Sequence, residues 1–417
     1  MNQRVFGLGF LATCVLAYPI QASAPAAQGT AYLLLHSALS VWMLASWLGR
    51  DPDSDWVLGV GVLARLVLVG VAPFTTHDVE RYLWDGAVVL AGYDPYLLAP
   101  AAPTLADLRT VWPTSAAHVE FTTIYPPGAL ALFTMASSAG VEHAPVVWKI
   151  LVTVASIATL FVAAALLRRR GLGRHLPLVA LSPLLVLESG IGAHLDAFST
   201  LALVTALWAL DHRRVVVAGA ALAAGILAKF LPAVVLLPLV LVLRRWEAAV
   251  LAGVVATVTV GGYAVAAACG LWPLGGLAAF FTHARFGSPL AALFDMSFGS
   301  WGLIVGGLVV VAVVLVATIR AASRGTVDRA LQYALAMPLL VSPVVYPWYL
   351  TPLAVCTALS PSAVVLIWTL TLPLTYEVLN ELGATGDWTP ARWPLVVIAF
   401  GWMLGGAIDE LRVRRAT

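Results

Sequence analysis

The segment THDVERYLWDGAVVLAGYDPYLLAP, residues 76–100, concentrates charged and titratable side chains in a chain that is otherwise strongly apolar. Asp78, Arg81 and Asp85 are three and four residues apart, so a helix would place all of them on one face. Such a face can bind a polar substrate. It can equally form a cap and an ion pair on a helix at the membrane surface, with the intervening aromatic residues as interfacial anchors. The spacing alone supports both interpretations.

Further polar residues interrupt apolar runs downstream. Lys229, in AGILAKFLP, lies between two short apolar segments, where an ammonium group needs water, a carboxylate or a phosphate. An anion-binding role competes with simple extension of the side chain to the interface. His194 and Asp196, in GAHLDAF, separate two apolar segments, and a histidine satisfied at a helix end is the alternative interpretation.

Two other segments contain candidate substrate contacts. The stretch SPVVYPWYLTP predicts a proline-broken aromatic turn with Tyr346 and Trp348, for which interfacial anchoring is the simpler role. His283 and Arg285 are candidate phosphate ligands in the loop 270–300, although a solvated loop explains them equally well. Tyr125 opens YPPGAL, where two prolines begin a short apolar segment.

The composition places the chain among polytopic membrane proteins. Hydrophobic residues make up 61% of the sequence and charged residues 11%, with a mean hydropathy of +0.93, far from the values of a soluble domain. A net charge of +2 gives no sign of a nucleic-acid surface. Cys14, Cys269 and Cys356 are scattered and predict neither a disulfide framework nor a thiolate metal site. Neither GxxxxGK[ST] nor HExxH occurs, which excludes P-loop and zincin chemistry.

Apolar segments bounded by charge, Pro or Gly predict the membrane topology. They cover residues 5–20, 31–48, 56–73, 146–167, 176–190, 193–210, 215–229, 230–243, 248–268, 301–319, 330–343, 348–360, 361–379 and 394–411. Several are shorter than the roughly 20 residues that span the hydrocarbon, so those helices extend through flanking aromatics or pack inside the bundle. Residues 4–24 resemble a signal peptide, but an uncleaved first helix is the preferred interpretation.

Basic clusters orient these segments. They are Arg168 to His175, Arg213 and Arg214, Arg244 and Arg245, Arg320 to Arg329, and Arg412 to Arg415. The positive-inside rule makes all five cytoplasmic, and an even number of crossings separates consecutive clusters. Residues 125–140 would break this parity as a full crossing, so we expect a re-entrant or half-buried helix there. The polar groups outside the basic loops then share the extracytoplasmic face.

The sequence therefore predicts an all-α polytopic membrane protein. Residues 1–417 form a single transmembrane domain of about 13–14 transmembrane helices. Residues 74–124 form a large first extracytoplasmic loop with short interfacial helices, which carries the proposed active site.

The order of the polar motifs is more specific than any one of them. RYLWDG, GYDPY, YPPGAL, the Trp148–Lys149 pair, GAHLDAF, AKFLP and SPVVYPWYLTP follow one another as in the C-type (GT-C) integral-membrane glycosyltransferases. The chain resembles bacterial polyprenyl-phosphate-mannose-dependent mannosyltransferases and, more distantly, the catalytic subunit of GPI mannosyltransferase I. The resemblance covers roughly residues 60–350 and implies a GT-C-like bundle.

The resemblance also implies roles for individual residues. Asp78 matches the general base or its close partner, which must take the proton of the attacking acceptor hydroxyl. Asp85 would assist this base and Arg81 would orient it. The departing lipid phosphate would be stabilised by Lys229, His194, Arg285 and His283. Substrate contacts are expected from Tyr82, Trp84, Tyr125, Asp196, Tyr346 and Trp348.

The first loop differs from that of the eukaryotic relatives in one respect. They carry two acidic residues separated by one position, whereas this chain has HDVER, with Asp78 as the first carboxylate before Glu80. We therefore expect transfer without a metal or other cofactor, with a divalent metal as the alternative.

The expected function is transfer of a sugar, by preference mannose, from a polyprenyl-phosphate donor at the extracytoplasmic face of the cell membrane. The expected partners are this lipid-linked donor, a glycolipid or glycan acceptor and membrane lipids, with no nucleic acid. A transporter or flippase of lipid-linked sugars is one alternative, but polar groups at one face rather than at the midplane favour the enzyme. A glycan ligase or polymerase with a diphosphate-linked donor is the other.

Overall fold

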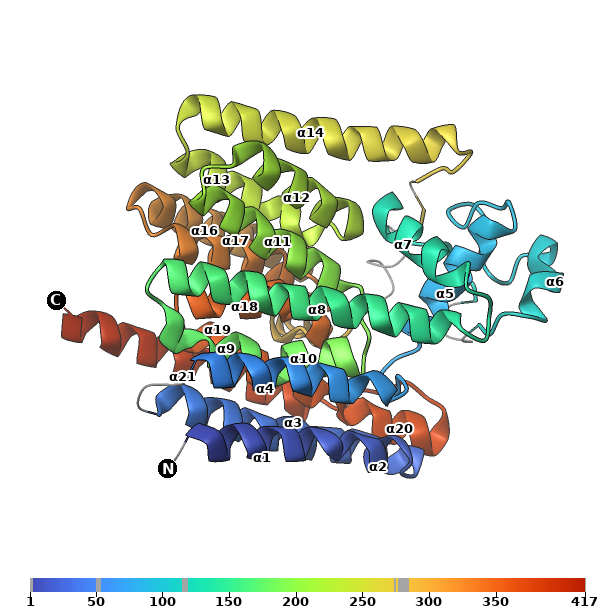
Figure 1. The fold of residues 1–417 in the computed structure, drawn as a ribbon, viewed down its shortest axis with the longest axis horizontal. Coiled ribbons are helices and arrows are strands. Elements are labelled where there is room, and N and C mark those ends of the chain that lie inside the picture. Colours follow the sequence, from blue (N-terminus) through green and yellow to red (C-terminus); the bar gives the residue numbers. More distant parts are fainter. Residues whose placement is uncertain (1–2, 50–53, 115–118, 274, 277–284, 417) are drawn as a thin grey trace.

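The chain folds into a bundle of helices in the computed structural model, which describes residues 3–49, 54–114, 119–273, 275–276 and 285–416 (Figure 1). No strand occurs in these ranges apart from an isolated bridge between Phe286 and Val344. The predicted all-α polytopic membrane fold is confirmed.

The helices follow the predicted segments closely. Before the first large loop lie α1 (Gln3–Val15), α2 (Ala17–Gln21), α3 (Pro25–Leu48) and α4 (Ser54–Val67). The loop region contains α5 (Asp78–Leu90), α6 (Ala106–Arg109) and α7 (Pro127–Ser137). The middle of the chain forms α8 (Ala144–Arg169), α9 (Pro177–Ala180), α10 (Pro183–Gly190), α11 (Asp196–Asp211), α12 (Val215–Ala228), α13 (Leu236–Val242) and α14 (Arg245–Ala268). The last part forms α16 (Pro289–Ser323), α17 (Val327–Val341), α18 (Thr351–Leu359), α19 (Ala363–Thr371), α20 (Val378–Thr385) and α21 (Trp393–Ala416).

Long and short helices occupy different places in the bundle. In the described part of the chain, seven helical stretches are long and apolar enough to cross a membrane: 4–21, 25–48, 144–169, 245–268, 301–323, 363–385 and 393–412. Short elements such as α10 and α18 are instead buried along their whole length. Short helices that do not span the hydrocarbon must have their backbone N–H and C=O groups hydrogen-bonded inside the protein, and this burial allows it.

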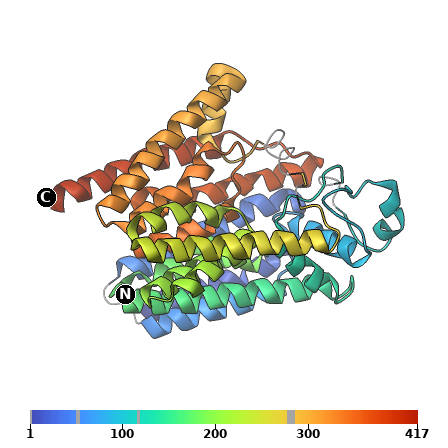
Figure 2. The ribbon, with the colours of Figure 1, turned by 90° about the horizontal axis from the view of Figure 1, so that it is seen from above.

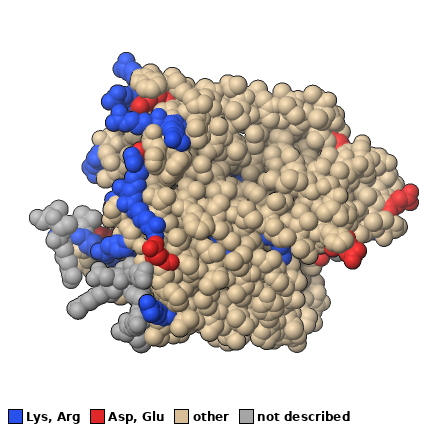
Figure 3. Space-filling model, viewed as in Figure 1, with Lys and Arg blue, Asp and Glu red and all other residues tan. Residues whose placement is uncertain are grey.

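Basic side chains join several helices at one end of the bundle. Arg170, after α8, forms ion pairs of 2.7 Å with Asp211, at the end of α11, and with Asp328, at the start of α17. Arg168 contacts Asp55 in the first turn of α4. Most Lys and Arg side chains on the face shown in Figure 3 gather at this end, whereas acidic side chains lie at both ends. The helix ends therefore meet in the pattern that the crossing parity predicts.

The loop region with α5, α6 and α7 lies at the end of the bundle opposite the basic cluster (Figures 1 and 2). With 11 residues, α7 is about 16 Å long, too short for a hydrocarbon layer of roughly 30 Å. It packs against α5 so closely that a Cβ atom at Gly86 would lie 2.5 Å from the backbone of Phe133. The Ser137 hydroxyl also donates to the Leu83 carbonyl at 2.8 Å. Both contacts fix the orientation of α5.

Candidate active site

Asp78 opens α5 at the junction between the loop region and the bundle. Its side chain is 17% exposed, so solvent or a substrate can reach it. The Tyr82 hydroxyl, one helical turn later, donates to Asp78 Oδ2 at 3.2 Å. The same oxygen lies 3.6 Å from His194 Nδ1, across the boundary with the bundle. Asp78 is therefore a reachable carboxylate with a fixed orientation.

A sharp turn between α10 and α11 places His194 beneath Asp78. Ala193 adopts a positive φ of 49°, which is unusual for a residue with a side chain, and the Trp148 indole donates to its carbonyl at 2.8 Å. The His194 amide donates to the Glu188 carbonyl at 3.0 Å. The His194 ring is 1% exposed and stacks on Trp348 with centroids 3.8 Å apart. Stacking on Trp348 thus fixes the plane of the ring, and the hydrogen bond to the Glu188 carbonyl fixes the backbone of His194.

Glu188 is a site residue that the sequence analysis did not single out. Its side chain is 2% exposed, and its Oε2 lies 3.3 Å from His194 Nε2. The Tyr376 hydroxyl lies 3.1 and 2.9 Å from its two oxygens, and the Tyr32 hydroxyl donates at 3.2 Å. An acidic residue inside the apolar run SPLLVLESG was the available signal, because an intramembrane carboxylate needs specific partners.

Lys229 and Asp196 form a second polar pair beside His194. The ammonium group lies 2.7 and 2.6 Å from the two Asp196 oxygens and 4.1 Å from the centre of the Tyr349 ring. Asp196 is 1% exposed and Lys229 20%. The sequence predicted that Lys229 contacts water, a carboxylate or a phosphate, and in the structure it contacts the Asp196 carboxylate.

The predicted aromatic turn forms one wall of the site. The rings of Tyr346 and Trp348 are nearly parallel, with centroids 4.4 Å apart, and Trp348 continues the stack onto His194. Phe286 lies 4.8 Å from Tyr346, so the exposed Arg285 that precedes it is near this wall. His283 lies outside the described residues.

Arg81 and Asp85 lie deeper in the loop region. They form a 3.0 Å ion pair with side chains 7% and 0% exposed, and Arg81 also donates to the Phe121 carbonyl at 2.8 Å. Trp84 is likewise buried, in the hydrophobic core of the loop region. Side chains buried in this way do not reach the surface of the site in this conformation. The substrate contact expected of Trp84 and the assistance expected of Asp85 stay predictions, and the structure places both side chains in the interior of the loop region.

We expect Arg81→Met to destabilise the loop region strongly. The change leaves the Asp85 carboxylate buried without its cation, which typically costs about 3–5 kcal/mol. Thermal unfolding of the purified protein measures the effect. The double variant Arg81→Met/Asp85→Leu is expected to recover stability, and equal melting temperatures for the wild type and Arg81→Met would contradict this account of the pair.

Tyr82 and Tyr125 pack edge to face, with ring centroids 5.3 Å apart, next to Asp78. Burial raises the pKa of both hydroxyl groups well above the ordinary value, and the Asp78 carboxylate raises it further. Tyr82 therefore stays protonated and remains a hydrogen-bond donor to Asp78. The structure shows its contact with the candidate base, and the predicted contact of Tyr82 with substrate stays a prediction.

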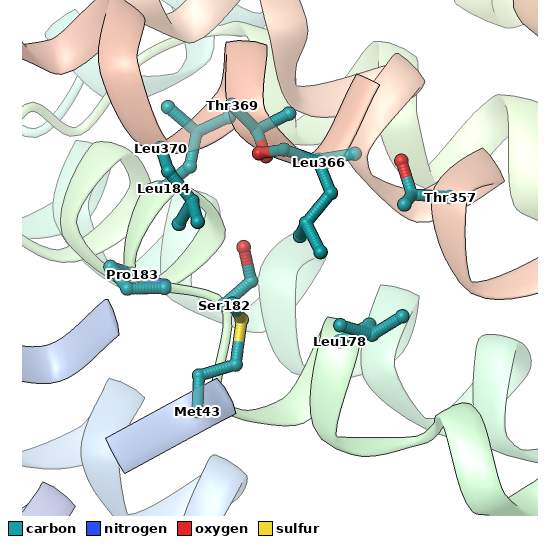
Figure 4. Close-up of a pocket in the computed structure, with 10 residues that line it drawn as sticks. Met43, Leu178, Ser182, Pro183, Leu184, Thr357, Leu366, Thr369 and Leu370 are labelled. Atoms are coloured by element: carbon teal, nitrogen blue, oxygen red, sulfur yellow. The ribbon is translucent and has the colours of Figure 1, made fainter. Parts of the chain in front are cut away.

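Two small cavities in the described part of the bundle differ in their linings. One, of about 20 Å³, lies behind His194 and is lined by Arg65, Ser156, Thr159, Leu185, Glu188, Ser189, His194, Asp196, Ala197, Thr200 and Thr351. The other, of about 10 Å³, has a mostly apolar lining with a few hydroxyl groups and includes no site residue (Figure 4). Only the first belongs to the site. Among the described residues, no group of three or more His, Cys, Asp or Glu side chains is arranged to hold a metal ion.

The Asp78 carboxylate, the His194 imidazole and the Lys229 ammonium group gather at one end of the helical bundle. The family model "Alpha-(1->6)-mannopyranosyltransferase, N-terminal domain" matches residues 11–245, more than half of the chain. The chain belongs to this family and is a mannosyltransferase of the GT-C class, which confirms the resemblance seen in the sequence.

No curated protein and no solved structure matches the chain. The matched range includes Asp78, Glu188, His194, Asp196 and Lys229. The aromatic wall at residues 346–349 follows it in sequence and joins the site only through the fold.

Proposed function

We propose that this protein transfers mannose from a polyprenyl-phosphate donor to a lipid-linked or glycan acceptor and forms an α-(1→6) linkage. The observation that carries the proposal is the partly exposed Asp78 carboxylate, oriented by Tyr82 and adjacent to His194. Membership of a mannosyltransferase family supports an enzyme rather than a flippase.

Asp78 acts as the general base in this proposal. The acceptor hydroxyl oxygen attacks the anomeric carbon of mannose as its proton passes to Asp78. The bond between that carbon and the phosphate oxygen breaks, and its electron pair leaves with the lipid phosphate. Positioned proton transfer of this kind contributes about 10²- to 10⁴-fold to a rate.

Lys229 is the proposed contact for the departing phosphate. An ammonium group has three N–H donors, and the two oxygens of Asp196 take two of them. The third can donate to a phosphate oxygen, and the 20% exposure of Lys229 gives access. The exposed Arg285 is the second proposed phosphate contact. The buried His194 ring faces carboxylates at both nitrogens, which favours a role at Asp78 over the predicted phosphate contact.

The proposed active site faces the extracytoplasmic side, because the basic helix ends lie at the other end of the bundle. Cys269 follows α14 and is exposed, whereas Cys14 and Cys356 are buried. We expect a membrane-impermeant maleimide to label Cys269 in intact cells. A Leu172→Cys residue in a Cys269→Ser background should react only after permeabilisation. Labelling of position 172 from outside would contradict the orientation.

Product analysis tests the proposed reaction. Purified protein is incubated with polyprenyl-phosphate mannose and an alkyl α-mannoside acceptor, and the products are identified by mass spectrometry and linkage analysis. We expect a disaccharide product with an α-(1→6) bond. Another linkage, or hydrolysis of the donor as the only reaction, would contradict the proposal.

A further inference from the structure

His194 lies between two carboxylates that belong to different helices. Its Nδ1 is 3.6 Å from Asp78 Oδ2 and its Nε2 is 3.3 Å from Glu188 Oε2. Asp78 is partly exposed, whereas His194 and Glu188 are almost completely buried. The three groups therefore form a line from the substrate side of the protein into its interior.

The hydrogen bonds around this line indicate where its protons can go. Tyr32 and Tyr376 donate to Glu188, and Tyr82 donates to Asp78 Oδ2, so both carboxylates act as acceptors. Neither ring nitrogen of His194 makes a hydrogen bond to a described residue in this conformation, at 3.6 Å from Asp78 and 3.3 Å from Glu188. With its proton on Nε2, the neutral imidazole would donate to Glu188 and present a lone pair on Nδ1 to Asp78 once these contacts shorten. Apo active sites commonly have such long contacts, which shorten during reaction.

We propose that His194 and Glu188 form a proton relay that takes up the acceptor proton from Asp78. The inference rests on the proposed function. Asp78, once protonated, donates its O–H to His194 Nδ1 as the Nε2 proton passes to Glu188 Oε2. Asp78 returns to a carboxylate, the imidazole stays neutral with its proton on the other nitrogen, and Glu188 becomes a carboxylic acid. Each transfer breaks one bond to hydrogen and forms one.

The surroundings provide a route onward from Glu188. The 20 Å³ cavity behind His194 is large enough for one water molecule and includes Glu188 in its lining. A water there can hold the proton released by Glu188. The relay resets when that proton returns to Nε2 of His194 and Nδ1 gives its proton back through Asp78 to solvent or to the phosphate product, which restores the starting tautomer. The charged and titratable groups that surround His194 are Asp78 on α5, Glu188 on α10, Asp196 on α11, Lys229 after α12, Arg65 on α4, Tyr32 on α3 and Tyr376 before α20.

His194 and Glu188 act through Asp78 and are positioning residues rather than catalytic ones. The Arg65 guanidinium shares their cavity but is bound to the hydroxyl of Ser156 and to the carbonyls of Gly61, Ala180 and Val179. Arg65 is therefore a fixed charge beside the relay and not one of its members.

Glu188→Gln tests the relay in the full-length enzyme, with polyprenyl-phosphate mannose as donor. The amide keeps the size of the side chain but cannot take a proton. We expect kcat to fall by about tenfold to 10²-fold, with the KM for the donor and the melting temperature close to wild type. His194→Gln should show the same loss, and the double variant should lose no more than either single variant, because one unit has been removed.

The outcomes separate the relay from the proposed function. Near wild-type turnover of Asp78→Asn overturns the base itself. A large loss in Asp78→Asn with wild-type kcat in Glu188→Gln overturns the relay alone. If the losses of kcat in Glu188→Gln and His194→Gln multiply in the double variant, the relay is also overturned. A raised KM together with a lowered melting temperature overturns it as well, and indicates that the two residues serve packing. If Glu188→Gln does not fold, His194→Gln and its combination with Asp78→Asn give the same comparison, because the relay predicts no further loss once Asp78 is replaced.

Discussion

Asp78→Asn is expected to lower kcat by about 10²- to 10⁴-fold while leaving donor binding and folding nearly unchanged. The amide preserves the shape of the side chain and can still accept a hydrogen bond from Tyr82. It cannot take the acceptor proton. Because deprotonation assists the transition state more than ground-state binding, the loss should appear in kcat. Initial rates at saturating donor, together with a melting curve, measure it.

Glu80→Gln is the matched control for this prediction. Glu80 is in the same first turn of α5, its side chain is 41% exposed, and it pairs with His77 at 3.4 Å. Glu80→Gln removes the same formal charge from the same helical turn. We expect its kcat to stay within about twofold of wild type, as for most surface substitutions. Equal losses of kcat in Asp78→Asn and Glu80→Gln would mean that the effect comes from the negative charge at the start of α5 and not from proton uptake by Asp78.

Lys229→Met is expected to have two effects, because Lys229 contacts Asp196 and is the proposed contact of the donor phosphate. It leaves Asp196 buried without its cation, which costs about 3–5 kcal/mol of stability. It also removes a charge-assisted contact to the donor phosphate, worth roughly 1.5–3 kcal/mol, or about tenfold or more in productive use of the donor. Melting curves report the first effect, and kcat/KM for the donor per folded molecule reports the second.

A double variant separates the two contributions of Lys229. Lys229→Met/Asp196→Asn removes the buried charge and should recover much of the stability, while the use of the donor stays impaired. Lys149→Met is the control lysine, since Lys149 is 5% exposed and donates to the carbonyls of Leu68 and Val71. It should lower stability without lowering donor use by folded protein. Wild-type kcat/KM in the double variant would leave Lys229 with a structural role only.

Much of the fold could be predicted from the sequence, because hydropathy and the position of basic residues are local signals. Most of the predicted apolar segments lie within helices, although α16 begins at Pro289, inside the expected loop 270–300. The arginines of the predicted cytoplasmic loops meet at one end, as the Arg170 pairs with Asp211 and Asp328 show. The sequence also indicates Asp78, His194 and Lys229 as candidates, since each interrupts an otherwise apolar or interfacial pattern.

The remaining details of the site depend on contacts between distant parts of the chain. The partners of Glu188 are Tyr32 and Tyr376, which are 156 and 188 residues away in sequence. Helical spacing predicted a common face for Asp78 and Asp85, but spacing does not tell which part of a face a neighbouring helix covers. Asp85 is buried in its pair with Arg81, which also donates to the Phe121 carbonyl 40 residues later in the chain, whereas Asp78 stays reachable. No local pattern contains that information.

The most direct test of the central claim is the choice of donor by purified protein in proteoliposomes. Equal amounts of polyprenyl-phosphate mannose, polyprenyl-diphosphate mannose and a nucleotide-linked mannose are offered separately with one mannoside acceptor, and Asp78→Asn protein serves as the inactive reference. Our account predicts a mannosylated product with polyprenyl-phosphate mannose and the wild-type protein only. Product formation with the nucleotide or diphosphate donor in place of the phosphate donor, or with the Asp78→Asn protein at the wild-type rate, would contradict it.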